Sequence, residues 1–77
     1  MATLMMQEID GTMTPIEAIE ADEGFMHLQG GALTACNQKG LHLYKGGSEY
    51  YLADENKMVV ASGMTNIKTY INFFVMR

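Results

Sequence analysis

The chain has 77 residues, a net charge of −4 and a single cysteine, and 48% of its residues are hydrophobic. This length allows one domain, the single cysteine excludes a disulfide within the chain, and no apolar run is long enough to span a membrane. One thiol without an evident signal peptide predicts a cytoplasmic location. A domain this small buries only about 60% of its unfolded surface, so we expect a partner protein or self-association to contribute stability.

Acidic residues gather in the first third of the chain. Residues 1–30 hold six Asp and Glu and no Lys or Arg, whereas all five basic residues lie in residues 31–77. This distribution is a poor match to phosphate groups, so direct nucleic-acid binding is not expected. The acidic end is predicted to be a solvated face, and the alternative is a surface aimed at a basic partner, as in a mimic of nucleic-acid charge.

The N-terminal region is predicted to form a strand, a turn and a short acidic helix. Residues 2–9 are apolar enough for a strand, and Asp10-Gly11 is a common hairpin turn. Residues 14–23 have the layout of a helix start, with a threonine cap, a proline in the first turn and a glutamate three positions after the cap. The alternative is a strand followed by a hairpin loop at residues 21–24, but the helix is favoured.

Five short strands are predicted next, separated by turn residues, at residues 25–29, 32–36, 41–45, 49–53 and 58–62. Loops this short join antiparallel neighbours. Residues 65–76 place apolar side chains at helical spacing and also alternate as a strand would, and the helix is favoured because it can cover the sheet. The predicted fold class is α+β: an antiparallel β-meander of five to six strands, a C-terminal helix packed on one face, and the short acidic helix near the N-terminus.

Some apolar and acidic side chains fall outside the predicted core. Tyr44 and Tyr51 lie on the outer face of the sheet, where polar residues are usual, and this predicts that something packs there. In the predicted C-terminal helix, the apolar stripe that faces the sheet ends at Phe74. Phe73 and Met76 lie off this stripe and are expected to be exposed. The predicted protein-interaction residues are Tyr44, Tyr51, Phe73 and Met76, together with the acidic Glu17 and Glu20.

Patterns typical of catalysis or metal binding are thin. Cys36 and His42 could meet on adjacent strands, an arrangement that activates a thiol, but an inert buried cysteine is more common. One cysteine and two histidines fall short of the four ligands of a structural zinc site, and residues 54–56 fit a turn better than a calcium loop. We therefore expect that the protein is not an enzyme and that it binds neither a cofactor nor a metal ion.

The sequence favours a small non-enzymatic protein–protein interaction protein that occupies a partner's surface and forms a homo-oligomer. Its general form, a compact acidic meander with a closing helix, resembles many small proteins of phages and mobile elements. The small size, the acidity and the lack of catalytic signatures make an inhibitor from a phage or mobile element the concrete version of this expectation. One alternative is a small-ligand-binding or minor enzymatic domain that uses Cys36 and His42. The other is an acidic charge mimic that competes with nucleic acid for a basic protein.

Overall fold

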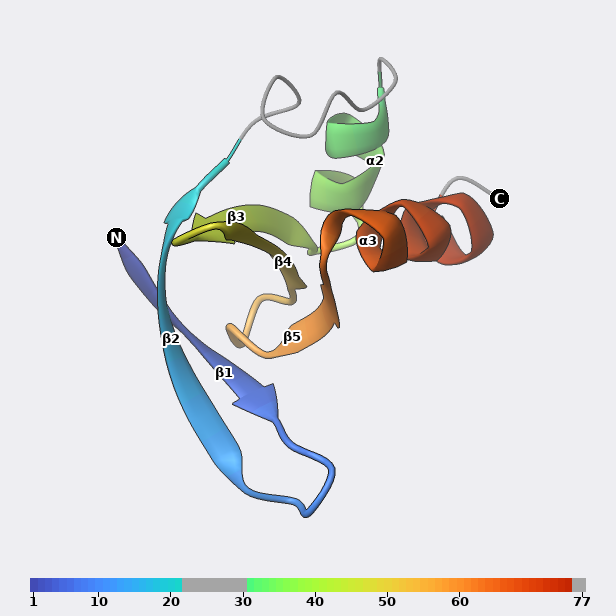
Figure 1. Cartoon of the computed structure of the whole chain (residues 1–77). Helices are drawn as coiled ribbons and strands as arrows, with labels where there is room; N and C mark the ends of the chain where they lie inside the picture. Colours follow the sequence, from blue (N-terminus) through green and yellow to red (C-terminus); the bar gives the residue numbers. More distant parts are fainter. Residues whose placement is uncertain (22–30, 76–77) are drawn as a thin grey trace.

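The computed structural model describes residues 1–21 and 31–75 (Figure 1). Its strands form one antiparallel sheet in the order β1-β2-β3-β4-β5, so each strand pairs with the next one in the chain. A sheet of this kind accompanied by helices agrees with the predicted α+β class. The elements are β1 (Ala2–Gln7), β2 (Met13–Glu20), α2 (Ala32–Gln38), β3 (His42–Gly46), β4 (Glu49–Ala53), β5 (Val59–Ser62), α3 (Met64–Tyr70) and η1 (Ile71–Val75).

The acidic segment after the first turn is a strand, and the predicted helix over residues 14–23 is wrong for its described part. β2 pairs with β1 along six residues, with Leu4 opposite Ile16. The Asp10-Gly11 turn is present: the Asp10 carboxylate accepts hydrogen bonds from the backbone N–H and the hydroxyl of Thr12, at 3.0 and 2.7 Å. Cross-strand pairing and the burial of Leu4 outweigh the local helix signals, because propensity is a weak prior. Residues 22 and 23 lie outside the described residues.

Pro15 is compatible with β2 because of where it lies in the ladder. Met5, opposite Pro15, donates its N–H to the carbonyl of Lys57 at 2.8 Å, so the Met5–Pro15 pair exchanges no hydrogen bonds. The missing N–H of the proline therefore faces away from β1. On that side β2 pairs with β3 only through Ile19 and Glu20. A proline on such an edge also hinders an added strand from pairing there.

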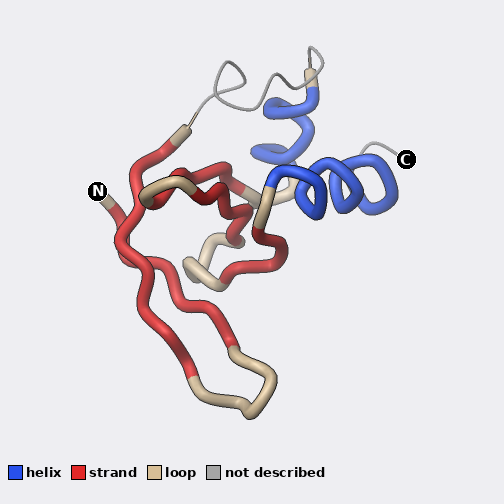
Figure 2. The backbone as a smooth tube through the Cα atoms, viewed as in Figure 1, coloured by secondary structure: helices blue, strands red, loops and turns tan. Residues whose placement is uncertain are grey.

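The sheet curls, and both faces of β3 and β4 are covered (Figures 1 and 2). The first core lies between the sheet and the helices, and the second lies between β3–β4 and the β1–β2 hairpin. The curl brings β1 beside the start of β5, where Met5 forms a parallel bridge with Met58. The first core comprises Ala32, Cys36, Leu41, Leu43, Leu52, Ile67, Ile71 and Val75, and the second comprises Leu4, Ala18, Tyr44 and Ala53.

Helix α2 occupies the position of the strand predicted at residues 32–36. Ala32 and Cys36, four residues apart, are both buried in the first core, as expected for one face of a helix. Its end has a Schellman pattern: the N–H of Leu41 donates to Cys36 O at 2.8 Å and the N–H of Gly40 donates to Asn37 O at 3.1 Å. Gly40 has φ of +76°, the left-handed conformation that this stop requires. The strand predicted at residues 25–29 lies outside the described residues.

The C-terminal segment is helical from Met64 to Val75, and its second part, η1, is a π-helix. Ile67 and Ile71 are buried as predicted, but the third inner position belongs to Val75, and Phe74 is exposed. A π-helical turn holds more residues than an α-helical turn, so the residue that faces the core after Ile71 is Val75 and not Phe74. The change leaves two adjacent phenylalanines outside the core.

Candidate functional site

Tyr44 and Tyr51, predicted to meet a partner, instead face the chain's own hairpin. Tyr44 is only 1% exposed and packs in the second core with Leu4 and Ala18. Tyr51 lies opposite Tyr44 on β4 and is half-buried against the same core. The expectation that something packs on this face is correct, but the covering element is β1–β2. Tyr44 is therefore not presented to a partner in this fold.

Lys57 is a structural residue that the sequence interpretation missed. Its φ of +66° makes it the one non-glycine residue with positive φ among the described residues. Its carbonyl accepts the N–H of Met5 at 2.8 Å, and its Nζ donates to the Tyr44 hydroxyl at 3.2 Å. Asp54 Oδ1 accepts the N–H groups of Asn56 and Met58 at 2.9 and 3.0 Å, which makes residues 54–57 a turn, as predicted. Lys57 thus ties this turn to β1 and the second core.

Cys36 and His42 do not form an activated pair in the described geometry. Cys36 is buried in the first core, and desolvation raises the pKa of its thiol. The side chain of Leu43, next to His42 on β3, enters the same core as that of Cys36. A raised pKa lowers the thiolate fraction at neutral pH, and only the thiolate is nucleophilic. These observations weigh against thiol chemistry.

Residues 1–21 and 31–75 hold no group of three or more His, Cys, Asp or Glu side chains that could bind a metal ion. No helix in the same parts of the chain is long and apolar enough to cross a membrane.

The acidic residues of the hairpin are exposed and are held by threonines. Thr3 donates to Glu17 at 2.7 Å, and Thr14 donates to Glu8 at 2.9 Å. The hydrogen bonds of Thr12, first that of its backbone N–H, lower the pKa of Asp10 and favour its charged form. Glu17 and Glu20, both predicted to contact a partner, are three positions apart on a strand and so point to opposite faces.

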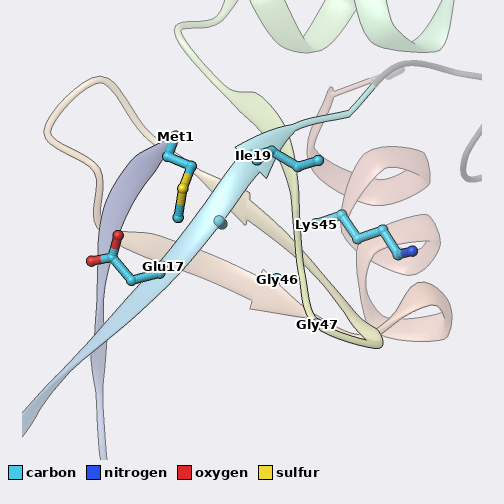
Figure 3. A pocket seen from close by; sticks show the side chains of 7 residues that line it. Met1, Glu17, Ile19, Lys45, Gly46 and Gly47 are labelled. Atoms are coloured by element: carbon cyan, nitrogen blue, oxygen red, sulfur yellow. The ribbon is translucent and has the colours of Figure 1, made fainter.

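A recess of about 230 Å³ lies where β2 meets the β3–β4 turn (Figure 3). Gly46 permits the close approach of the strands here, since a Cβ on it would lie 2.9 Å from the carbonyl oxygen of Glu17. In Figure 3 the side chains of Glu17 and Lys45 extend away from each other. The lining residues are Met1, Glu17, Ala18, Ile19, Lys45, Gly46 and Gly47.

Two other recesses are open and polar. One, of about 400 Å³, lies between Lys39–Gly40 and the turn at residues 54–56. The other, of about 160 Å³, lies between α2 and β3 and includes His42 and Asn37 in its lining. Neither brings Cys36 into contact with a base.

The C-terminal helical segment, α3 and η1, presents an exposed apolar surface. Phe73 and Phe74 are 58% and 67% exposed, and the ring of Tyr70 lies beside that of Phe74 with 4.9 Å between centroids. Phe73 is exposed as predicted. Phe74 was missed because its exposure follows from the π-helical turn, which the apolar spacing does not reveal. Met76 lies outside the described residues.

Comparison of the chain with protein-family models, curated proteins and solved structures finds no match.

Proposed function

We propose that the protein is a small non-enzymatic interaction protein that acts by occupying a surface of a partner protein and that also self-associates. An inhibitor encoded by a phage or mobile element is the concrete form of this proposal, consistent with the small size and net negative charge. The observation that carries it is the adjacent pair Phe73 and Phe74, both more than half exposed on η1. Fully burying one phenylalanine is worth about 1.5–3 kcal/mol, so the pair offers a substantial driving force for association.

A second copy of the chain is the occupant that we assign to the Phe73–Phe74 surface. From Met64 to Val75 the sequence contains one charged residue, Lys68, and no acid. Two such surfaces can therefore meet without opposing carboxylates, although the chain as a whole is negatively charged. The tilted contact between the rings of Tyr70 and Phe74 limits the motion of the Phe74 ring, which reduces the entropy lost on association.

Sedimentation equilibrium on matched variants tests this assignment. The double variant Phe73→Ser/Phe74→Ser removes the apolar surface, while Asn72→Ser changes an exposed polar residue of the same turn. We expect the wild type and Asn72→Ser to dimerise and the double variant to remain monomeric at the same concentration. Circular dichroism should show the same helix content in all three proteins, because both phenylalanines lie outside the core. A wild type that stays monomeric at millimolar concentration, or a double variant that dimerises equally well, contradicts the assignment.

A charge mimic is the second candidate, favoured by the exposed carboxylates of Glu8, Asp10 and Glu17 on a hairpin without basic side chains. Such a protein would bind a basic protein with an affinity that falls steeply as salt rises. Binding that does not change between low and physiological salt would exclude it.

A further inference from the structure

We infer that the outer surface of the β1–β2 hairpin docks a partner protein that presents basic side chains around an apolar centre. The inference rests on the proposed function and supplies the chemistry of the partner. We call this the hairpin surface, and define it by Ile9 and Asp10 at the turn and by Met13, Pro15, Glu17 and Ile19 along β2.

Apolar side chains are the first evidence for this docking site. Along β2 the inner positions Ile16 and Ala18 pack in or against the second core, whereas the alternate positions Met13, Pro15, Glu17 and Ile19 are exposed. A solvated outer strand face normally carries polar residues. Four of the seven exposed large apolar residues identified in the described chain instead lie in its first 19 residues: Met1, Ile9, Met13 and Ile19.

The charge of the hairpin identifies the kind of partner. The carboxylates of Glu8, Asp10 and Glu17 accept hydrogen bonds from threonines and lie on a hairpin that has no Lys or Arg. A second copy would place like charges opposite one another, and nucleic acid would be repelled. A basic protein surface is complementary in sign, which speeds encounter and fixes orientation.

The shape of the hairpin indicates contact through side chains. Pro15 lies on the edge of β2 beyond its short pairing with β3, and a proline there opposes the addition of a partner strand. Beside the hairpin surface, the recess in Figure 3 is lined by Met1, Ile19 and Glu17 and also by Lys45, whose side chain extends away from that of Glu17. An arginine of the partner fits the side of this recess formed by the hairpin and away from Lys45, because its stem can lie on Met1 or Ile19 while its guanidinium pairs with the carboxylate of Glu17.

An NMR titration of the ¹⁵N-labelled protein with two synthetic peptides tests the inference. The first peptide alternates arginine with leucine, and the second, of equal length, alternates arginine with serine. We expect the first to shift amides of residues 8–19 and of the recess, and to bind at least about tenfold more tightly than the second, which lacks apolar groups. Met13→Ser/Glu17→Gln should weaken binding of the first peptide by a similar factor. The matched control Val60→Ser/Glu55→Gln, also one exposed apolar and one acidic residue, should leave it unchanged.

Other outcomes overturn the inference and separate it from the proposed function. No shift at millimolar peptide, equal binding of both peptides, or equal binding by the two double variants excludes the hairpin surface as the docking site. Hairpin amides that shift with protein concentration alone would assign this surface to a second copy instead. If Phe73→Ser/Phe74→Ser still abolishes dimerisation in any of these cases, the inference fails while the proposed self-association stands. If Phe73→Ser/Phe74→Ser leaves dimerisation unchanged and Met13→Ser/Glu17→Gln leaves peptide binding unchanged, both the proposed self-association and the inference fail.

Discussion

The ammonium of Lys57 donates a hydrogen bond of 3.2 Å to the hydroxyl of Tyr44 and lies 5.6 Å from the centre of its ring. The two residues belong to different layers: Tyr44 is buried in the second core, whereas Lys57 is exposed on the turn before β5. The carbonyl of Lys57 also accepts the N–H of Met5. One residue thus connects the turn, the buried tyrosine and the N-terminal strand.

Removing the hydroxyl of Tyr44 and removing the ammonium of Lys57 should lower the unfolding free energy by different amounts. Tyr44→Phe keeps the ring and leaves the ammonium free to bind water, so we expect a loss of about 0.5–1.5 kcal/mol in unfolding free energy. Lys57→Met leaves a buried hydroxyl without its partner and should cost about 1–3 kcal/mol. Urea denaturation of the two single variants and of the double variant measures these unfolding free energies. The double variant should resemble Tyr44→Phe, and equal, additive losses would show that the bond contributes nothing.

Gly46 is predicted to be intolerant of a side chain. An alanine Cβ would lie 2.9 Å from the backbone oxygen of Glu17 and 3.2 Å from the ring of Tyr51, and a backbone oxygen cannot rotate away. We expect Gly46→Ala to cost about 1–3 kcal/mol through overpacking and to shift the amides of residues 17–20.

Gly47→Ala is the matched control for this substitution. Gly47 has φ of +63° with nothing within 4 Å of its added Cβ, so the variant should cost about 1–2 kcal/mol of backbone strain without disturbing the hairpin. If Gly46→Ala leaves the amides of residues 17–20 unmoved, the close approach of β2 and β3 at this point is wrong.

The sequence predicted those parts of the fold that depend on local signals. β3, β4 and the Asp10-Gly11 turn follow from alternation and turn chemistry, and all three are present. β2 was only the alternative to the favoured helix, because its pairing with β1 is a long-range interaction that competes with a local Thr-Pro-x-Glu helix start. For α2 a signal existed: Gly40 provides a left-handed helix stop, but a short apolar run by itself does not distinguish a strand from a helix.

Among the apolar residues predicted to be exposed, exposure was predicted correctly only where it depends on local spacing. Phe73 is such a case. Tyr44 is not, because its burial depends on a hairpin that folds back from the other end of the chain. Phe74 and Val75 exchange roles through one π-helical turn, a change that apolar spacing does not encode. The exposed apolar face of β2 was not predicted, because residues 14–23 were assigned to a helix, which places Pro15, Glu17 and Ile19 on different faces.

Cys36 should be unreactive in the folded protein. Its thiol is buried and desolvation raises its pKa, so alkylation by iodoacetamide at neutral pH should be much slower than in denaturant. Equal rates in the folded and denatured protein would restore the thiol-dependent alternative.

The same pKa shift predicts a loss of stability at alkaline pH. In the unfolded chain the thiol ionises with an ordinary pKa of about 8.5. In the folded state burial raises the pKa, so the thiol retains its proton to higher pH. Above the unfolded pKa the folded state therefore binds more protons, and the unfolding free energy falls as pH rises toward the folded pKa. Urea titrations below and above this range should show that decline in the wild type and a smaller one in Cys36→Ala. A decline of equal size in both proteins would assign it to other groups.

The most direct measurement is a series of ¹H–¹⁵N correlation spectra of the wild-type protein from micromolar to millimolar concentration. Self-association through the C-terminal helical surface predicts that the amides around Phe73 and Phe74 shift together with one dissociation constant, while those of the hairpin surface stay in place. Spectra that do not change with concentration at any described residue would contradict self-association. Shifts centred on residues 8–19 would show that the copies meet through the hairpin surface, which contradicts the assignment to Phe73 and Phe74.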